Sequence, residues 1–548
     1  MEINDAVRLA ILNIQKESIT DVDVFSRPFE VDYLSNKENQ KKIYDIVEGR
    51  IKKALNAIKK GKVPFEALKE LKVSPLRNLL VPKKNLFDFR KCSYTEPIDE
   101  IIYLSLVLII APKIEKQRIN KKNEIVFSYR LKRKIIEETT PCYLFDKKYS
   151  YTPFRSCVSK RAQEFGAKVI VSCDVSNFYD RLNLHRLENT LLSIPNIDKD
   201  VVALINELLL FWSNRDSYGL PVGSNASRIL AEASLLSVDK YLLEKGIKFI
   251  RFVDDYRLFA KDGKEAHSWL SILVDRLNQE GLFLNTSKTK ISSYQDIKKE
   301  QNNLSPKEDS EMEKTELPLI IRGYSGIIPT KFRQLSEHEI TNLQDIDIVA
   351  FEKEKIDKDL IDPLDLQKFL RTIVAQKKWD ILSKSALYLS KFPQFIPYYL
   401  DCVYKNYDNL KDYEKQIKDE VMKLGEDTTL LEYLRIYIFK YLSINTDNTK
   451  YLLNTYLNLK RGEGIYLGRS LLENIFKNVN RDDVLEIKKT FQRADSPEKR
   501  IILRIMHYKL NKDEFNVFIK NISLTEPDPW IEIIFDEKIK EKTKENLK

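Results

Sequence analysis

The chain has few of the residues that build zinc sites and disulfide frameworks. Its 548 residues include five cysteines and four histidines, and no two cysteines have the C-x-x-C spacing. This scarcity argues against a zinc site or a disulfide framework, so any metal ion should be bound by carboxylates. Glycine is also scarce, with 14 residues. So few glycines predict few tight turns and much helix, and they disfavour an all-β barrel or sandwich.

Long hydrophobic runs are absent as well. The longest uncharged apolar stretch, residues 101–112, is about half as long as a membrane span requires. The first residues, MEINDAVRLA, do not resemble a signal peptide. We therefore expect no membrane contact and a cytoplasmic location. With 43% hydrophobic and 32% charged residues, the composition is that of a soluble globular chain, and its length suggests two to four domains.

Positive charge is concentrated in one region. The net charge is +10, but residues 51–150 alone hold 23 Lys and Arg against 11 Asp and Glu. A local excess of this size suits a polyanion such as nucleic acid or nucleotide phosphates. The alternative is an ordinary solvated helix surface.

Residues 165–295 contain the predicted strands. The apolar run 167–175 predicts a buried strand that leads into an acidic turn, and residues 247–253 and 256–263 predict a hairpin. Residues 282–285 predict a further short strand. The stretch between the hairpin and this strand has helical periodicity and ends at Gly281, a C-terminal helix cap.

The second half of the chain has a different pattern. Residues 295–316 are polar and charged, which predicts a surface insertion. From residue 346 onward, apolar stripes recur in segments of about 15–20 residues, typical of a stacked helical-repeat array of HEAT type. The glycine-rich stretch 462–468 lacks the spacing and the preceding strand of a nucleotide-binding loop, so we predict a turn between helices.

Three carboxylates are placed where they could bind metal ions together. Asp174 follows the first predicted strand, and Asp254 and Asp255 lie at the tip of the hairpin. Adjacent carboxylates between apolar strands repel one another and lose hydration, and a divalent cation relieves that cost. Oxygen ligands favour Mg²⁺ or Mn²⁺, and three carboxylates can bind two ions for nucleotidyl transfer. The alternative for the Asp254–Asp255 pair is a solvated turn.

A loop of small residues lies between the two acidic segments. The loop spans residues 219–227 and opens into a helical run. Gly223 and Asn225 within it would let a nucleotide or base pair approach the backbone closely. The alternative is a helix N-terminus capped by Ser or Asn.

The order of these segments resembles the palm of reverse transcriptases. Their motifs A, B, C and D correspond here to Asp174 with Tyr179, Gly219–Ser227, Phe252–Asp255 and Leu284–Thr289. The stretches SNFYDRL, GLPVGSNASRILAE and RFVDDYRLF are similar to those of bacterial abortive-infection and defence-associated reverse transcriptases. That resemblance implies an α+β palm and fingers domain over residues 1–345. An all-α HEAT-like domain over residues 346–548 would stand in place of a thumb.

The resemblance also implies roles for single residues. Asp174 and Asp254 would bind two Mg²⁺ or Mn²⁺ ions, with Asp255 as a weaker ligand and Val175 among the metal-contacting positions. Lys288 would assist departure of the pyrophosphate. Lys290 is the rival for that role, and a surface lysine is the alternative for either.

The remaining predicted site residues belong to the nucleotide site. Tyr179 would lie under the incoming sugar and exclude a 2′-hydroxyl; the alternative is a core tyrosine. Arg130, with Lys132 second, would grip the triphosphate, because a guanidinium binds phosphate oxygens in a bidentate way. Phe252 of motif C, together with Gly223 and Asn225, completes the predicted nucleotide-binding set.

The implied function is that of an antiviral, abortive-infection type DNA polymerase that uses dNTPs. Several members of the family synthesise single-stranded DNA without a template and start it on a protein hydroxyl. No residue among the 27 tyrosines is singled out as the primer. One alternative is a reverse transcriptase that copies a cognate non-coding RNA. Another is a non-catalytic helical scaffold with a remnant palm. Helical-repeat domains commonly supply partner surfaces, so we expect a homo-oligomer.

Overall fold

The computed structural model describes residues 1–82, 89–294, 331–460, 462–520 and 528–535. The chain divides into two compact units. The first comprises Met1–Leu76 and Cys92–Met312, and the second comprises Arg77–Lys91 and Glu313–Lys548. The chain therefore passes between the units three times. The predicted insertion at 295–316 lies outside the described residues.

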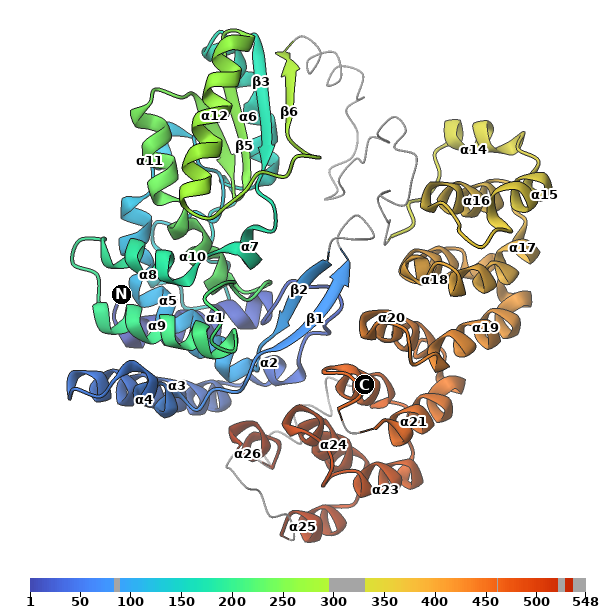
Figure 1. Cartoon of the computed structure of the whole chain (residues 1–548). Helices are drawn as coiled ribbons and strands as arrows, with labels where there is room; N and C mark the ends of the chain where they lie inside the picture. The colour runs from blue at the N-terminus through green and yellow to red at the C-terminus, as the bar shows by residue number, and fades with distance from the viewer. Residues whose placement is uncertain (83–88, 295–330, 461, 521–527, 536–548) are drawn as a thin grey trace. The chain divides into compact units, whose positions relative to one another are not determined.

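The first unit is mixed α/β (Figure 1). Its helices are α1 (Ile3–Glu17), α2 (Phe29–Tyr33), α3 (Lys37–Lys59), α4 (Pro64–Leu68), α5 (Pro97–Gln117), α6 (Tyr151–Glu164), α7 (Phe178–Arg181), α8 (Leu184–Leu192), α9 (Lys199–Trp212), α10 (Asn225–Ser234), α11 (Leu236–Glu244) and α12 (Gly263–Gln279). Its main strands are β3 (Val169–Asp174), β4 (Phe249–Phe252), β5 (Asp255–Ala260) and β6 (Lys290–Ser293).

The four strands form one antiparallel sheet in the order β4-β5-β3-β6. Ile170 and Val171, which point to opposite faces of β3, are both fully buried, so both faces of the sheet are covered. Helix α6 packs on the face that carries Ile170, Ile250 and Phe259, and α12 contacts β3 and β5. These two helices fix the sheet as a rigid support for the residues at its end.

The predicted β3 strand, the β4–β5 hairpin and the α12 helix are confirmed. Gly281 follows α12 with φ +75°, as expected of a C-terminal cap. The predicted strand at 282–285 is wrong, because only Leu284 forms a bridge, with Val175. Its neighbour β3 ends at Asp174, one residue before Val175, so too little partner strand remains for a ladder. The strand beside β3 is instead β6, which pairs with Val169–Ser172.

Helix α5 is the centre of the helical part of this unit. It is apolar around its whole circumference and contains the run 101–112, the longest apolar stretch of the sequence. Helices α1, α3, α9 and α10 pack around it, which explains why a helix of this composition is buried. Within the described residues no helix is both long and apolar enough to span a membrane.

In the residues that the structure describes, the second unit is helical apart from β1 (Arg77–Pro82) and the beginning of β2 (Phe89–Tyr94). Its helices are α14 (Glu337–Gln344), α15 (Ile348–Phe351), α16 (Pro363–Ala375), α17 (Trp379–Lys384), α18 (Ile396–Lys405), α19 (Glu414–Glu426), α20 (Glu432–Leu442), α21 (Thr449–Asn458), α22 (Leu467–Ile475), α23 (Arg481–Lys489), α24 (Ser496–Lys509), α25 (Lys512–Lys520) and α26 (Pro529–Phe535).

The contacts among these helices follow a simple order (Figure 1). Helices α18, α20, α22, α24 and α26 contact one another in succession. On a second row, α17 contacts α19 and α21 contacts α23, and the rows are joined by α19–α20, α21–α22 and α23–α24 contacts. Each helix thus buries its apolar face mainly against near neighbours in the sequence. The domain boundary predicted near residue 345 stays a prediction. The two compact units instead divide at residue 312, and the helical unit also includes residues 77–91.

Candidate functional site

The three predicted carboxylates lie at one end of the four-stranded β4-β5-β3-β6 sheet, which is the predicted palm sheet. Asp174, the last residue of β3, is the direct partner of Asp255, the first residue of β5. Asp254 stands in the β4–β5 turn, and its carbonyl accepts a hydrogen bond from the Val175 N–H at 3.2 Å. The strand register therefore brings together residues that are 80 positions apart in the sequence.

The charges of this cluster are partly compensated. Lys288 Nζ lies 2.9 Å from Asp174 Oδ2, and Arg257 Nη1 lies 2.8 Å from Asp255 Oδ1. Burial, and then the negative charge of Asp174, raise the pKa of Asp254 to about 7. Asp254 is thus the carboxylate whose charge is least well compensated by the protein.

Of the two lysines predicted to assist the leaving group, Lys288 contacts the acidic cluster, whereas Lys290 lies in strand β6. The Lys288 side chain is 57% exposed, so its ammonium can also reach a ligand beside Asp174. Lys290 begins β6 opposite Ser172, two residues before Asp174. The geometry favours Lys288 over Lys290 as the cation of the site.

The donor set suits a divalent cation. Within the described part of the chain, no three His, Cys, Asp or Glu side chains are already arranged as a metal site. The chemistry nevertheless fits, because the Asp254 carboxyl is destabilised as an anion by burial and by its acidic neighbours, and a cation would relieve this. The side chain of Val175 is buried and its N–H is engaged, so a contact with an ion would come from its carbonyl oxygen.

Tyr179 lies on the short helix α7 that follows the acidic turn. Its side chain is half-buried, with its ring 5.6 Å from that of Phe178. Its carbonyl accepts the Leu220 N–H at 3.0 Å, which ties the small-residue loop to α7. The predicted gate residue and the predicted loop are therefore adjacent, and the role under a sugar stays a prediction.

The small-residue loop ends in a capped helix, as the alternative interpretation expected. Ser224 is the N-cap of α10, and its Oγ accepts the Ala226 N–H at 3.1 Å. Gly223 has φ +109°, and a Cβ there would collide with the hydroxyl of Thr20. The close approach that the glycine permits is used by the N-terminal segment of the chain itself.

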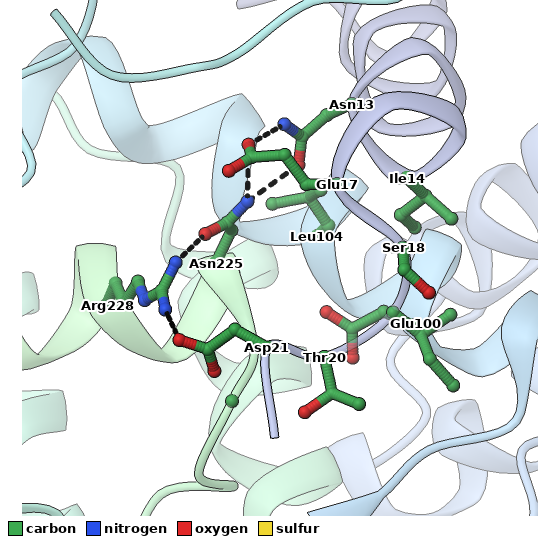
Figure 2. Close-up of a pocket in the computed structure, with 12 residues that line it drawn as sticks. Asn13, Ile14, Glu17, Ser18, Thr20, Asp21, Glu100, Leu104, Asn225 and Arg228 are labelled. Atoms are coloured by element: carbon green, nitrogen blue, oxygen red, sulfur yellow. Dashed lines mark hydrogen bonds and ion pairs between the residues drawn. The ribbon is translucent and has the colours of Figure 1, made fainter. Parts of the chain in front are cut away.

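Asn225 is likewise engaged with the N-terminal helix (Figure 2). Its amide nitrogen donates to Asn13 Oδ1 at 2.9 Å and to Glu17 Oε2 at 3.0 Å, and its oxygen accepts from Arg228 Nη1 at 2.7 Å. Arg228 also pairs with Asp21. The cavity that remains here is about 30 Å³, enough for about one water molecule. Nucleotide contacts by Gly223 and Asn225 stay predictions.

The residues predicted for the triphosphate have protein partners. Arg130 is 2% exposed; its Nε donates to Glu115 Oε1 and its Nη1 to the Ile119 carbonyl, both at 2.8 Å. A triphosphate contact by Arg130 would require these bonds to open. Lys132 is half-exposed, and its Nζ is 3.4 Å from Glu138 Oε1. The buried position of Arg130 was not expected from the sequence.

Phe252 of the predicted motif C lies in an aromatic cluster. Its ring centroid is 5.4 Å from that of Tyr151, 5.9 Å from Phe154 and 6.2 Å from Tyr129. Its side chain is half-buried, so its remaining surface could contact a nucleotide. The cluster ties the hairpin to α6.

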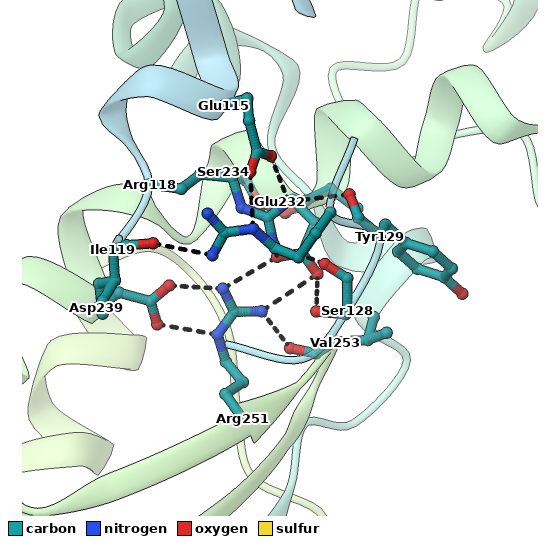
Figure 3. Close-up of polar contacts among 12 residues, drawn as sticks. Glu115, Arg118, Ile119, Ser128, Tyr129, Glu232, Ser234, Asp239, Arg251 and Val253 are labelled. Carbon is teal, nitrogen blue, oxygen red and sulfur yellow. Dashed lines mark hydrogen bonds and ion pairs between the residues drawn. The ribbon is translucent and has the colours of Figure 1, made fainter. Parts of the chain in front are cut away.

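A buried ionic network behind the hairpin was missed by the sequence analysis (Figure 3). Its centre is Arg251, which binds Glu232 and Asp239. A clue was present in the sequence: an arginine interrupts an otherwise apolar strand two residues before its turn. The partners lie 12 and 19 residues away on two helices, a distance over which no local pattern operates.

Comparisons with known proteins find similarity over the part of the chain that builds this site. Residues 114–319 match the family model described as reverse transcriptase (RNA-dependent DNA polymerase). A curated relative, the retron Ec86 reverse transcriptase of Escherichia coli, is 22% identical over 227 residues, which cover 40% of this chain and 70% of the relative.

Solved structures give a much weaker likeness. Telomerase from Candida albicans, in complex with a TWJ fragment of telomeric RNA, matches with a TM-score of 0.29 and 13% identity over 66% of this chain. The chain spans 64% of the length of that telomerase. Apo telomerase from Candida tropicalis also gives a TM-score of 0.29, with 10% identity, over 78% of this chain and 68% of its own.

The family match covers the acidic cluster, Lys288 and the whole palm sheet. Two independent observations therefore coincide: the carboxylates meet at one end of an antiparallel sheet, and the sequence around them matches reverse transcriptases. The part of the chain that builds the site, residues 114–319, is therefore similar to reverse transcriptases.

Proposed function

We propose that this chain is an antiviral DNA polymerase of reverse-transcriptase type, which transfers dNTPs by two-metal nucleotidyl transfer. The observation that carries the proposal is the meeting of Asp174, Asp254 and Asp255 at one end of the palm sheet, with Lys288 beside them. Carboxylates in this arrangement are the oxygen ligands that nucleotidyl transfer needs. A remnant palm in a non-catalytic scaffold would have no use for such a cluster.

Asp174 and Asp254 would hold two Mg²⁺ or Mn²⁺ ions, with Asp255 as the weaker ligand. When bound, the ions would lower the pKa of the attacking hydroxyl and balance the charge of the pyrophosphate. Lys288 has an exposed ammonium 2.9 Å from Asp174, so it can donate a proton or a positive charge to the leaving group. Arg257 holds the Asp255 carboxylate in place through their ion pair.

We further propose untemplated synthesis that starts on a protein hydroxyl and leaves single-stranded DNA attached to the chain. This proposal is supported by the resemblance to abortive-infection reverse transcriptases. The two-row contact order of α17–α26 supports a helical-repeat domain in place of a thumb. A homo-oligomer is proposed because helical-repeat domains commonly supply partner surfaces, and a cytoplasmic location is proposed from the first residues of the sequence.

The second candidate is a templated enzyme that copies a cognate non-coding RNA. The 22% identity to a retron reverse transcriptase favours it. RNase treatment of the purified protein separates the two: templated synthesis is lost, whereas untemplated synthesis continues. DNA that stays with the protein through denaturing extraction and is released by protease supports protein priming.

The decisive experiment replaces one carboxylate. Asp254→Asn should abolish dNTP incorporation in the presence of Mg²⁺ or Mn²⁺ and leave the fold intact, because it removes a metal ligand and also a like-charge repulsion. Asp275→Asn, an exposed change on α12 of the same domain, is the matched control and should incorporate dNTPs normally. Incorporation by the Asp254→Asn protein would contradict the assignment of the site.

A further inference from the structure

The turn that presents Asp254 has an unusual backbone conformation. Val253, the residue before Asp254, has φ +55°. The left-handed region is a true outlier for a β-branched residue, and such a conformation costs about 1–3 kcal/mol unless its surroundings hold it. Val253 is buried, so the restraint must come from neighbouring protein groups.

The Arg251 side chain supplies one such restraint (Figure 3). Its Nη1 donates a hydrogen bond to the Val253 carbonyl at 2.7 Å. Arg251 is fully buried, so water does not compete for this bond. The guanidinium thus reaches back along its own strand to the strained residue.

The guanidinium is itself held from two helices. Its Nε and Nη2 donate to the two carboxylate oxygens of Asp239 on α11, at 2.8 and 2.5 Å. Its Nη1 and Nη2 also lie 3.3 and 3.1 Å from the two oxygens of Glu232 on α10. Two bidentate contacts fix the plane of the guanidinium, and with it the donor that meets Val253.

Glu232 is fixed and charged in turn. It accepts hydrogen bonds from Ser128 Oγ and, at 2.6 Å, from Arg118 Nη2. Burial opposes ionisation of Glu232, but Arg251 and Arg118 lower the pKa of this carboxyl below its usual value. The network is therefore a rigid buried framework that joins α10, α11 and the hairpin.

We propose that Arg251 is a positioning residue, which holds Val253 in the left-handed conformation and so aims the Asp254 carboxylate toward the metal ions and nucleotide. This inference rests on the proposed function. The alternative is an ordinary buried ion-pair network that stabilises the fold and has no particular effect on Asp254.

The two explanations differ in what Val253→Gly does. Glycine adopts positive φ without the steric cost, so a glycine at position 253 lets the turn form without the Arg251 bond. If Arg251 acts through the backbone of Val253, then Val253→Gly should rescue an Arg251 variant. If Arg251 only stabilises the core, glycine offers no compensation.

The experiment compares four proteins: wild type, Arg251→Met, Arg251→Met with Val253→Gly, and Arg118→Met. Arg118→Met is the matched control, because it removes a buried guanidinium from the same network but no bond to the hairpin. Three quantities are measured: the melting temperature, Mn²⁺ binding by electron paramagnetic resonance without nucleotide, and dNTP incorporation with Mn²⁺. Should Arg251→Met not fold, Arg251→Lys, which keeps the positive charge, takes its place in both proteins.

We expect Arg251→Met to weaken Mn²⁺ binding or incorporation about 10- to 100-fold, the usual effect of losing a group that orients a metal ligand. The double variant should regain most of this loss without regaining melting temperature. Arg118→Met should lower the melting temperature and keep Mn²⁺ affinity close to that of wild type. Equal losses in Arg118→Met and Arg251→Met, or no rescue by glycine, would overturn the proposal.

The outcome is separable from that of the proposed function. If wild type binds Mn²⁺ through Asp254 but incorporates no nucleotide, the polymerase proposal fails, and the positioning role is decided by the Mn²⁺ titrations alone. If wild type and Arg251→Met bind Mn²⁺ equally and incorporate nucleotide equally, the positioning role fails while the polymerase proposal stands.

Discussion

At the scale of single residues, Glu100 is an acid placed where its charge is unfavourable. Its two oxygens accept hydrogen bonds from Ser224 Oγ at 2.5 Å and Thr95 Oγ1 at 2.9 Å. Burial raises the pKa of Glu100 from 4.5 to about 8. Folding therefore favours the protonated form of Glu100. Because Ser224, the N-cap of α10, bonds to Glu100, protonation of this acid couples the helix cap to the pH.

We predict that Glu100→Gln flattens the pH dependence of the free energy of unfolding. The folded chain keeps the Glu100 proton up to about pH 8, whereas the unfolded chain loses it near pH 4.5. The contribution of Glu100 to the free energy of unfolding is complete below pH 4.5. It is lost as the pH rises to 8, at up to about 1.4 kcal/mol per pH unit. Glutamine can form hydrogen bonds with both hydroxyl groups without carrying a charge. In urea titrations, the free energy of unfolding of the variant should therefore rise relative to that of wild type from pH 5 to pH 8. Parallel pH profiles would contradict this.

We predict that Tyr179→Ala reduces discrimination against ribonucleotides. If the ring lies under the sugar, its removal opens space for a 2′-hydroxyl, and the preference should fall by more than the roughly 10- to 200-fold that one methylene-sized difference gives. Tyr179→Phe keeps the ring and should keep the preference. The ratio of deoxy- to ribonucleotide incorporation is measured together with the melting temperature. A large stability loss with unchanged sugar preference would identify Tyr179 as a core residue.

The carboxylate residues could be predicted from the sequence, but their supports could not. Asp174, Asp254 and Asp255 follow apolar strands, so the local pattern locates them. Arg130 is held by Glu115 of α5, and Arg251 pairs with Asp239 of α11, so both depend on how separate helices pack around the sheet. Such long-range contacts leave no periodicity in the chain.

At the scale of elements, the glycine-rich stretch 462–468 forms the predicted turn between helices, and the side chain of Glu432 holds this turn. Glu432 Oε1 accepts the backbone N–H groups of Ile465, Tyr466 and Leu467 at 2.8, 2.7 and 2.9 Å. Gly464 has φ +83°, and a Cβ there would lie 2.8 Å from the same oxygen. The three N–H groups of this turn are thus satisfied by a carboxylate of the chain itself.

We predict that Glu432→Ala lowers the free energy of unfolding of the helical unit by about 1.5–3 kcal/mol, the range for a hydrogen bond to a charged group. Three N–H groups at the start of α22 lose their acceptor. Glu432→Gln keeps a carbonyl oxygen and should lose less. Urea denaturation of both variants gives the two values. Equal losses would show that the charge and the oxygen of Glu432 are not what stabilises the turn.

At the scale of the whole molecule, the helical unit is built from two separate stretches of chain. Strand β1 contacts α20. Arg77 Nη1 donates to Asp495 Oδ2 at 2.7 Å and to the Ile465 carbonyl at 3.0 Å. Burial, and then the charge of Asp495, raise the pKa of Glu498 to about 7, and Arg77 opposes this. This arrangement could not be predicted from the sequence, because residues 77–91 precede the predicted palm and lie far from the helical unit along the chain.

We predict that a fragment of residues 331–548 is less stable than the same unit in the full chain. Without residues 77–91 the fragment lacks Arg77, and Asp495 and Glu498 are left to repel each other. Adding a peptide of residues 77–91 should raise the melting temperature of the fragment, followed by circular dichroism. The same peptide with Arg77→Met is the control and should raise it less. A melting temperature indifferent to the peptide would contradict this role.

The three passages of the chain between the units also bear on how this architecture can change in evolution. A recombination event that replaced everything after residue 312 would leave residues 77–91 behind with the first unit. The incoming helices would then contact residues 77–91, which were selected to fit the surface of the original helices. Arg77 would face whatever residue replaced Asp495. Exchange of the helical unit as a single cassette is therefore disfavoured. The sequence of the helical unit should therefore diverge together with residues 77–91.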